Sequence, residues 1–339
     1  MSFRILYVGS NSGTSKHRVD ALIRLGHQVN LIDPNSFLPK NWFVSRWQHE
    51  TGGIFLENIV RNKIINYLNS ENKFYDLVFV NQGELISPEL IKIFSQFSGK
   101  IINYVNDNPF AERDKNRWKY YLKSVPVYDL LVVIRECNVP EAYALGAKKV
   151  VRVFMSADEV AHVPRILSNE DIKKWSSEVL FIGTWMPERG PLIAKLIEGG
   201  VPLSIYGNRW SKAEEWQLIK QCWKGNGLYG DDYAKAIQTS KVCLGLLSKG
   251  NRDLHTRRSL EIPYLGGLLC AERTDEHLYL YKENEEAVFW DDSRECIEQC
   301  FKLLANPELN KSIRENGRLK CIQNKTLNES ILKNVLLHV

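Results

Sequence analysis

The segment RDLHTRRSLEIPYLGGLLCAE, residues 252–272, contains the pattern that decides the fold. It begins with polar residues, continues with a helical spacing, turns at Gly266 and Gly267, and ends in the apolar run LLCA. Glycine adopts the backbone conformations that a tight turn requires, so the pair permits a short connection. A helix that leads at once into a buried strand is one step of a parallel α/β sheet.

The same alternation runs through the whole chain. Short apolar or β-branched runs predict strands in both halves, at residues 4–9, 28–33, 76–81, 100–105, 129–134, 150–155, 178–183, 202–207, 241–247, 266–271 and 287–290, with a further short strand in 227–233. Amphipathic stretches between these runs predict helices. We therefore predict an α/β protein with two Rossmann-like, doubly wound domains that face each other across a cleft.

A chain of 339 residues exceeds the size at which a single core keeps growing, so two domains are expected. Residues 156–177 are polar and lack a sustained apolar period, which places the boundary there. We expect the first domain over residues 1–165, the second over 166–325, and a C-terminal helix over 326–339 that packs back on the first domain. Ser211, three residues before Glu214, predicts a capping-box start for one helix of the second domain.

Composition and charge exclude several classes of protein. The chain is 44% hydrophobic and 25% charged, lacks a membrane-spanning run, and begins with a buried-strand pattern, so a cytoplasmic location is expected. Residues 1–165 carry 21 Lys and Arg against 16 Asp and Glu, and residues 166–339 carry 24 of each. This mild charge without a basic-aromatic RNA motif predicts no nucleic-acid partner. The seven cysteines lack a CxxC pair, which argues against a zinc site or a disulfide framework.

The opening segment also carries the predicted chemistry. If its helix begins near Thr256, Glu261 lies in the second turn, and Arg257 and Arg258 share its face. Arginines at a helix N-terminus attract phosphate, and a carboxylate beside them can accept hydrogen bonds from ribose hydroxyls. An exposed Arg257–Glu261 ion pair, worth about 0.3–0.5 kcal/mol, explains the spacing equally well.

Other strand ends have related patterns. In FIGTWMPERGPLI, Gly183 and Arg189 lie between a strand and a helix, which suits a diphosphate. IYGNRW is a strand that ends at Gly207, and in GLYGDDY we expect Asp231 or Asp232 to cap the next helix.

The motifs FIGTWMPER, IYGNRW, YGDDYAKAIQTSKVCLGLL and TRRSLEIPYLGGLLCAE follow one another in an order and spacing that resembles the C-terminal domain of group 1 glycosyltransferases, specifically the CgeB-like branch. The resemblance covers roughly residues 178–318, and the first half resembles these enzymes only in fold. It implies the GT-B architecture, a nucleoside-diphosphate sugar as co-substrate, and neither a metal nor another cofactor.

The resemblance also implies roles for individual residues. Glu261 would hold the nucleotide ribose, and Arg258 matches the R-x-x-E of the branch. Asp253 stands near the donor sugar, where related enzymes have the first glutamate of an E-x7-E pair, so the aspartate is a departure. The remaining residues implied to bind the donor are Gly183, Thr184, Arg189, Gly207, Asn208, Leu228, Tyr229 and Gly230.

An inverting reaction needs a base for the acceptor proton. His17 follows the first strand and the loop GSNSGTSKH, near the place where inverting GT-B enzymes keep their base, and a histidine pKa near neutrality suits that task. The same position also fits a residue at an ordinary helix start. Asp107 and Glu84 likewise follow strands, and a retaining reaction needs no such base.

Other functions stay open at this point. Two Rossmann-like halves fit an NAD(P)-dependent oxidoreductase, although the loop GSNSG lacks the G-x-G-x-x-G spacing. Asn106, Asp107 and Asn108 could form a degenerate metal pair, and a non-catalytic nucleotide-sugar-binding protein shares the fold. The expected partners of a transferase in surface glycan or polysaccharide biosynthesis are a nucleotide-sugar donor and a glycan, lipid-linked or protein acceptor. Basic and aromatic residues in 111–123 could give peripheral membrane contact.

Overall fold

The computed structural model describes residues 2–339, with the side chain of Lys115 left aside. The chain divides into two compact units. Unit 1 contains the chain up to Phe154 together with Gly250–Arg252 and Asn328–Val339, and unit 2 contains Met155–Lys249 and Asp253–Leu327. Unit 1 ends before the boundary expected at residue 165 because Met155 already belongs to unit 2, where its backbone N–H donates to His255 Nε2 at 2.9 Å.

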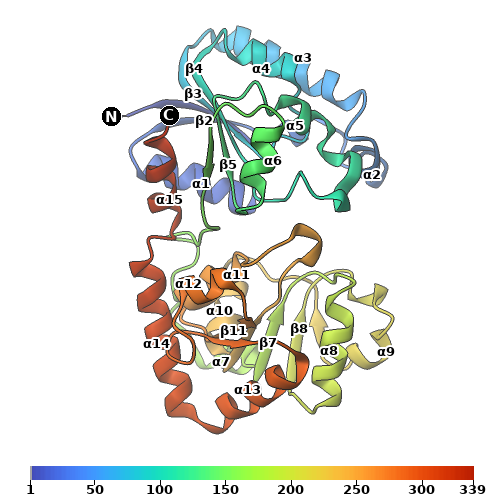
Figure 1. Ribbon diagram of the computed structural model, residues 1–339, viewed down its shortest axis with the longest axis vertical. Coiled ribbons are helices and arrows are strands. Elements are labelled where there is room, and N and C mark those ends of the chain that lie inside the picture. Colours follow the sequence, from blue (N-terminus) through green and yellow to red (C-terminus); the bar gives the residue numbers. More distant parts are fainter. Residues whose placement is uncertain (1) are drawn as a thin grey trace. The chain divides into compact units, whose positions relative to one another are not determined.

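Unit 1 is built on a six-stranded sheet with the order β2-β1-β3-β4-β5-β6, in which every neighbouring pair is parallel (Figure 1). Its strands are β1 (Arg4–Val8), β2 (Gln28–Ile32), β3 (Tyr75–Asn81), β4 (Ser98–Tyr104), β5 (Leu130–Val133) and β6 (Val150–Arg152). Its helices are α1 (Gly13–Arg24), η1 (Pro34–Phe37), α2 (Trp42–Thr51), α3 (Leu56–Glu71), α4 (Pro88–Phe94), η2 (Glu112–Trp118), α5 (Lys119–Ser124), α6 (Asn138–Ala144) and α15 (Asn328–Leu336).

The strands of unit 1 form where the sequence has unbroken apolar runs. Four of the five residues of β1 and all four residues of β5 are buried, because helices cover both faces of a parallel sheet. Helix α15 packs along α1, burying Ile331, Leu332 and Val335, and Arg24 of α1 pairs with Glu329 at 2.8 Å. The last helix of the chain thus completes the covering of the first sheet.

Unit 2 repeats this plan with the strand order β12-β11-β10-β7-β8-β9, again parallel throughout. Its strands are β7 (Val179–Ile182), β8 (Leu203–Tyr206), β9 (Trp223–Gly225), β10 (Val242–Gly245), β11 (Leu269–Glu272) and β12 (Val288–Trp290). Its helices are α7 (Asn169–Trp175), α8 (Arg189–Glu198), η3 (Trp210–Lys212), α9 (Trp216–Ile219), α10 (Gly230–Thr239), α11 (Arg258–Tyr264), α12 (Asp275–Leu280), α13 (Ser293–Ala305) and α14 (Pro307–Gln323). The short helix η4 (Lys249–Asn251) begins in unit 2 and ends in unit 1, directly before residues 252–272.

The α/β class with two doubly wound units is confirmed, whereas three local predictions are wrong. The short strand is β9 and not residues 227–233, since Gly230 already begins α10. Ser211 caps no helix, because it lies inside η3, where the neighbouring Trp210 is buried and donates to the Gly183 carbonyl at 2.9 Å. A capping box forms at Ser168 instead, which starts α7 within the stretch read as irregular.

Each sheet has one point where the direction of strand addition reverses. In unit 1 the chain runs from β1 to β2 on one side and then to β3 on the other. In unit 2, β8 and β9 lie on one side of β7, and β10 lies on the other. Ligands of open α/β sheets bind outside the carboxyl ends of the strands at such switch points. We therefore expect ligands to bind at the loops after β1 and β3 and at those after β7 and β10.

Candidate functional site

The loops at the carboxyl ends of β7, β8 and β9 are fastened to one another through their backbones. The Trp185 N–H donates to the Asn208 carbonyl at 2.9 Å, and the Gly207 N–H donates to the Gly225 carbonyl at 2.9 Å. A Cβ atom at residue 207 would lie 1.9 Å from the Gly183 carbonyl oxygen, so only glycine fits there. The structure thus brings Gly183 and Thr184 together with Gly207 and Asn208, as a shared edge of unit 2.

Arg189 links the two strands of the switch point. It is the first residue of α8, it is buried, and its guanidinium donates to the Thr184 carbonyl at 2.8 Å and to the Leu246 and Leu247 carbonyls at 3.1 Å each. Burial and the charge of Arg258 lower the pKa of Arg189 to about 10, so it is a cation at neutral pH. Arg189 therefore positions the loops after β7 and β10, and direct contact with a diphosphate stays a prediction.

Glu261 is held in α11 with only 7% of its surface exposed. Its Oε2 accepts a hydrogen bond from the Tyr233 hydroxyl at 2.6 Å, and its Oε1 lies 3.6 Å from His162 Nε2. His162 Nδ1 accepts the Asp158 N–H at 2.8 Å, so the ring turns Nε2 toward the carboxylate. Burial by itself raises the pKa of Glu261, but His162, two nearby arginines and Tyr233 lower it overall. Glu261 is a carboxylate at neutral pH.

Helix α11 begins at Arg258 and not near Thr256, so Glu261 lies in its first turn. An exposed ion pair with Arg257 does not explain the position of Glu261 in the sequence, because the Glu261 carboxylate is buried against Tyr233 and His162. Among the described residues, Arg258 Nε and Thr256 Oγ1 are buried atoms without a hydrogen-bond partner. An unsatisfied buried polar group costs about 1–3 kcal/mol, so both positions favour a ligand that supplies acceptors and donors.

A buried histidine network that the sequence did not reveal fixes the start of α11. The Thr256 N–H donates to Ser259 Oγ at 3.0 Å, and Ser259 Oγ lies 2.7 Å from His277 Nε2. His277 Nδ1 faces the Glu272 carbonyl at 2.6 Å, so Nδ1 carries the proton and Nε2 accepts the serine hydroxyl. Burial lowers the pKa of His277 to about 4, so the ring is neutral. His277 is not part of a sequence motif, so the sequence did not predict these hydrogen bonds.

The other predicted donor residues lie nearby on the same unit. Asp253 is buried before α11, and its charge acts on Arg189 by raising the pKa of that guanidinium. Leu228 is half-buried and Tyr229 is exposed in the loop before α10, and Gly230 begins that helix with φ 57°. The unit therefore gathers all of the predicted donor residues at or just after the carboxyl edge of its sheet.

The two acids after Gly230 do not cap α10 with their side chains. Both lie in its first turn, and Tyr229 occupies the N-cap position without a side-chain hydrogen bond. Asp231 instead pairs with Arg165 at 2.7 Å, so it connects α10 with the segment before α7.

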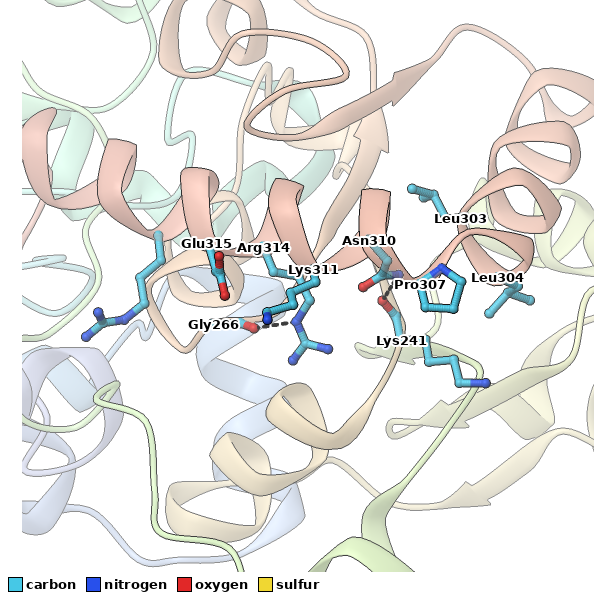
Figure 2. A pocket seen from close by; sticks show the side chains of 10 residues that line it. Lys241, Gly266, Leu303, Leu304, Pro307, Asn310, Lys311, Arg314 and Glu315 are labelled. Atoms are coloured by element: carbon cyan, nitrogen blue, oxygen red, sulfur yellow. Dashed lines mark hydrogen bonds between the residues drawn. The ribbon is translucent and has the colours of Figure 1, made fainter.

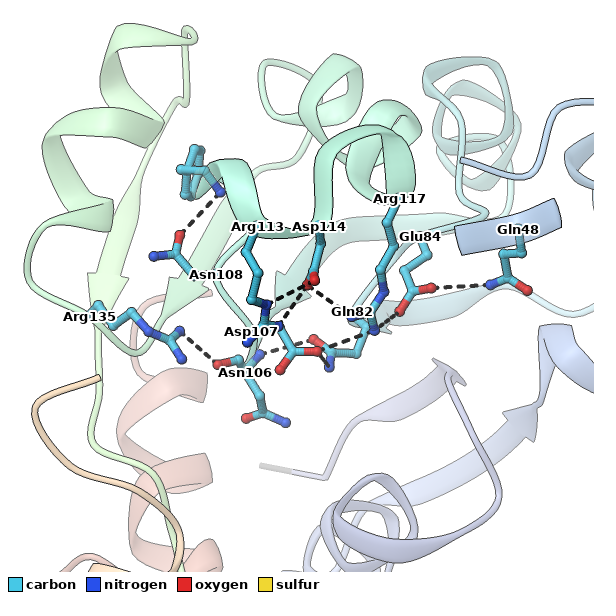
Figure 3. Close-up of polar contacts among 11 residues, drawn as sticks. Gln48, Gln82, Glu84, Asn106, Asp107, Asn108, Arg113, Asp114, Arg117 and Arg135 are labelled. Carbon is cyan, nitrogen blue, oxygen red and sulfur yellow. Dashed lines mark hydrogen bonds and ion pairs between the residues drawn. The ribbon is translucent and has the colours of Figure 1, made fainter. Parts of the chain in front are cut away.

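The switch point of unit 1 holds a polar cavity of about 170 Å³ between the loops after β1 and β3. Glu84 lines it and accepts hydrogen bonds from Arg117 at 2.6 Å and from Gln48 at 3.1 Å (Figure 3). Arg117 also pairs with Asp107 at 3.3 Å. The two candidate bases Glu84 and Asp107 are thus joined by one arginine.

His17 lies half-buried within α1, beyond the helix start. The next residue, Arg18, is a fully buried cation that the sequence analysis missed. It donates to Asn81 Oδ1 at 2.7 Å and to Asn106 Oδ1 at 2.6 Å, and its guanidinium lies 4.0 Å from the centre of the Tyr104 ring. A positive charge therefore lies beside the ends of β3 and β4.

The residues 106–108 do not fit a metal site. Asn106 Oδ1 and Asp107 Oδ2 accept from arginines, and Asn108 Oδ1 accepts from the Phe110 N–H at 3.1 Å and from Asn138 Nδ2 at 2.9 Å. Each of the three side chains thus has an oxygen that accepts hydrogen bonds within the chain, and the donors include the cations Arg18, Arg117 and Arg252.

Three cysteines meet in the apolar core of unit 2. The sulfur atoms of Cys270, Cys296 and Cys300 lie within 4.8 Å of one another, the one such grouping of three or more His, Cys, Asp or Glu ligands found among residues 2–339 apart from Lys115. Hydrogen bonding to the other two thiols, together with burial, raises the pKa of Cys270 well above the ordinary thiol value. Protonated thiols pack as small apolar groups, whereas three thiolates would suit a soft metal ion. The spacing of the cysteines in the sequence did not predict this group, because Cys270 comes from β11 whereas Cys296 and Cys300 come from α13.

Another cavity of unit 2, of about 380 Å³, lies at the amino ends of β10 and β11 (Figure 2). Its polar residues fasten α14 to the sheet: Arg314 donates to the Gly266 carbonyl at 2.8 Å, and Asn310 Nδ2 donates to the Lys241 carbonyl at 2.9 Å. This cavity opens at the edge opposite the switch point, so we do not assign it to the site.

The basic and aromatic stretch 111–123 does not present its aromatic residues as a membrane contact would require. Trp118 and Tyr121 are fully buried, and Arg113 and Arg117 pair with Asp114. No helix in the described part of the chain has the length and apolar character needed to cross a membrane.

Comparisons with known proteins agree with the fold. Residues 189–334 match a family model described as glycosyl transferase-like. The fold is similar to sucrose-phosphate synthase from Thermosynechococcus elongatus, with a TM-score of 0.71, 12% identity and 98% of each chain covered. It is also similar to HepE from Anabaena, solved with UDP and glucose (TM-score 0.68, 12% identity, 99% of this chain and 100% of HepE). A glycosyltransferase from Rickettsia africae has a TM-score of 0.63 and 15% identity, with 99% of this chain and 98% of that chain covered.

A search of curated protein sequences returned no match. The two parallel six-stranded sheets with flanking helices nevertheless match solved GT-B enzymes over nearly the whole chain. The chain therefore has the GT-B glycosyltransferase fold, and its residues 189–334 carry the glycosyl transferase-like sequence pattern.

Proposed function

We propose that this protein is a glycosyltransferase that moves a sugar from a nucleoside-diphosphate sugar to an acceptor. The observation that carries the proposal is Glu261, a buried and ionised carboxylate beside arginines at the carboxyl edge of the unit 2 sheet. It lies inside the segment that matches the family model. HepE, which shares the fold, is described in complex with UDP and with UDP-glucose, so uridine nucleotides are the first donors to test.

The proposed donor contacts depend on the further hydrogen bonds that Glu261 and Arg258 can form. A carboxylate offers about four lone-pair positions, and the hydroxyl of Tyr233 occupies one at Oε2 of Glu261, which leaves acceptors for two ribose hydroxyls. The buried Nε of Arg258 would donate to a diphosphate oxygen. Gly183, Thr184, Gly207 and the other residues of the fastened loops would line the rest of the nucleotide, with the base near Leu228 and Tyr229.

The chemistry depends on the leaving group. Cleavage of the sugar–phosphate bond places negative charge on the nucleoside diphosphate, and fixed positive charges aimed there stabilise the transition state more than the ground state. Helix α11 has only seven residues, so we assign this role to the guanidinium groups of Arg258 and Arg189 rather than to its dipole. We propose a metal-independent reaction on this basis.

We propose His17 as the base if the reaction inverts configuration, since it lies on the helix that follows β1. Asp107 and Glu84, joined by Arg117 at the same sheet edge, are the alternatives. Asp253 would contact the donor sugar. The CgeB-like resemblance further supports a cytoplasmic role in surface glycan or polysaccharide biosynthesis, with a glycan, lipid-linked or protein acceptor.

Calorimetric titration with the diphosphates of uridine, guanosine and thymidine tests the donor site. Because a charged hydrogen-bond partner contributes about 1–3 kcal/mol, we expect Glu261→Gln to weaken binding of the preferred nucleotide roughly 5- to 150-fold. Glu178→Gln is the matched control, since Glu178 is exposed and pairs with Lys241 before β10. Equal affinities of the wild type and Glu261→Gln would overturn the ribose assignment.

Two further measurements separate the alternative functions. Tight binding of NADPH, followed by its fluorescence, would favour an oxidoreductase. Sugar transfer that persists in EDTA would support the metal-independent reaction, and nucleotide-sugar binding without turnover on any glycan acceptor would favour the non-catalytic alternative.

A further inference from the structure

Helix α2 of unit 1 exposes an unusual group of aromatic side chains. Trp42 is 62% exposed, Phe43 74% and Trp47 46%, and Phe55, just beyond the helix, is 70% exposed. We call these four residues the aromatic patch. None of the ten residues of α2 is fully buried, and of its apolar side chains only Val44 packs against the core of unit 1. Large exposed apolar patches mark interaction surfaces.

The patch is held in a defined shape by polar contacts at its ends. The Asn41 side chain caps the helix by accepting the Val44 N–H at 2.9 Å, and Trp47 Nε1 donates to the Ile54 carbonyl at 2.9 Å. At the other end, Asn116 Nδ2 donates to the Glu50 carbonyl at 3.2 Å. The helix is therefore attached to unit 1 through the Glu50 carbonyl and the side chains of Val44 and Gln48, while Trp42, Phe43 and Trp47 stay largely exposed.

Charge around the patch favours an anionic surface. Unit 1 has 22 Lys and Arg against 15 Asp and Glu, a net charge of +7, whereas unit 2 has 23 against 25, a net charge of −2. Lys40 precedes α2, and Arg46 lies 5.2 Å from the centre of the Trp42 ring and pairs with Glu50 at 2.7 Å. Arg61, which pairs with Glu57, and Lys63 follow along the chain in α3. Basic residues near the surface of an anionic bilayer are attracted to its headgroups.

We propose that the aromatic patch docks unit 1 onto the surface of a lipid bilayer that contains anionic lipids. Trp and Phe with flanking Lys and Arg are the side chains of interfacial helices, because the rings enter the boundary between headgroups and chains while the cations stay with the headgroups. A second copy of the chain would bring the same positive surface against itself, which is unfavourable. The proposal does not depend on the proposed function, because it concerns a surface outside the donor site.

The cavities of unit 1 connect this surface with the sheet edge. A cavity of about 470 Å³ in the patch shares Trp42 and Val44 with a neighbouring cavity of about 380 Å³. That cavity in turn shares Asn35 and Gln48 with the polar cavity at the switch point. If the proposed function holds, an acceptor anchored in a bilayer would meet adjoining cavities between the docked surface and Glu84.

Vesicle flotation tests the proposal directly. We expect the wild-type protein to float with vesicles of phosphatidylcholine mixed with phosphatidylglycerol and to float much less with phosphatidylcholine alone. The double variant Trp42→Ser, Phe43→Ser should bind the mixed vesicles roughly tenfold more weakly or worse, since two exposed rings are removed. Phe74→Ser is the matched control, because Phe74 is 58% exposed at the opposite, amino end of β3 and should leave binding unchanged.

The remaining outcomes are also decisive. Failure of the wild type to bind the mixed vesicles, or equal binding by the double variant, would overturn the proposal. Concentration-dependent dimers in sedimentation that the double variant abolishes, without vesicle binding, would assign the patch to a second copy of the chain. UDP titration of the same variants keeps this test separate from that of the proposed function, since the substitutions lie in unit 1 and should leave nucleotide affinity unchanged.

Discussion

At the scale of single residues, the site depends on groups that lie far from one another in the sequence. Glu261 was recognisable from its motif, but the side chains that keep it ionised, Tyr233 and His162, come from α10 and from the segment after Asp158. Their contacts turn a buried carboxyl group, which would otherwise favour its neutral form, into a fixed acceptor.

Tyr233→Phe should shift the pH dependence of nucleotide binding. The Tyr233 hydroxyl donates to the carboxylate and helps to lower the pKa of Glu261, so its loss raises that pKa. Protonation of Glu261 then begins at higher pH, and we expect affinity for UDP to fall earlier as the pH decreases. Calorimetry across the acidic range measures this, with Tyr279→Phe as the exposed control. Superimposable profiles would show that the hydroxyl does not act on the bound carboxylate.

His277 should make the protein less stable in mild acid. Its pKa is lowered from 6.5 to about 4 in the folded state, so between these values the unfolded chain binds more protons and the free energy of unfolding falls as the pH falls. The full effect is roughly 3 kcal/mol, and it is complete below the folded pKa. Urea unfolding at a series of pH values should show this decline in the wild type and a shallower one in His277→Gln. An identical slope in both proteins would contradict the assignment.

At the scale of elements, the proposed donor site is formed by loops whose spacing the backbone fixes. The loops after β7 and β8 approach so closely that residue 207 has no room for a side chain, and Arg189 holds the loop after β7 to the loop after β10. Strand ends at a switch point leave an open edge, and these contacts give that edge a defined shape.

Gly207→Ala should destabilise the protein more than an equivalent change in the neighbouring loop. The new Cβ would lie 1.9 Å from the Gly183 carbonyl, a backbone atom that cannot move without disturbing β7, so we expect a loss of about 1–3 kcal/mol. At Gly227, the Cβ would meet the far end of the Tyr229 side chain at 3.2 Å, which can turn away. Thermal unfolding of the two variants gives the comparison, and equal melting temperatures would count against this close approach.

At the scale of the whole molecule, the chain passes between its units more than once. After building unit 1 and most of unit 2, it contributes Gly250–Arg252 to unit 1, returns to unit 2, and ends with α15 on unit 1. The stability of unit 1 therefore depends on residues at both ends of the sequence.

Removal of residues 328–339 should destabilise unit 1 selectively. The deletion removes the buried Ile331, Leu332 and Val335 from the surface of α1, and each buried side chain of this kind contributes about 1.5–3 kcal/mol. Hydrogen exchange should report faster opening of β1 and unchanged protection of β7. Equal loss of protection in both strands would mean that the units unfold as one.

Sequence patterns were enough to predict the α/β class, eleven of the twelve strands in the described residues to within a few positions, and the segment that contains Glu261. They could do so because strands buried on both faces need unbroken apolar runs, and a periodic pattern is a local property of the chain. Only the tertiary structure decided the order of the strands, the partners of Glu261, and the meeting of three cysteines from β11 and α13. Packing also decided that Trp118 is buried whereas Trp42 is exposed. Both tryptophans lie in stretches that mix aromatic and basic residues, so only the surfaces that the rest of the chain places against them distinguish the two.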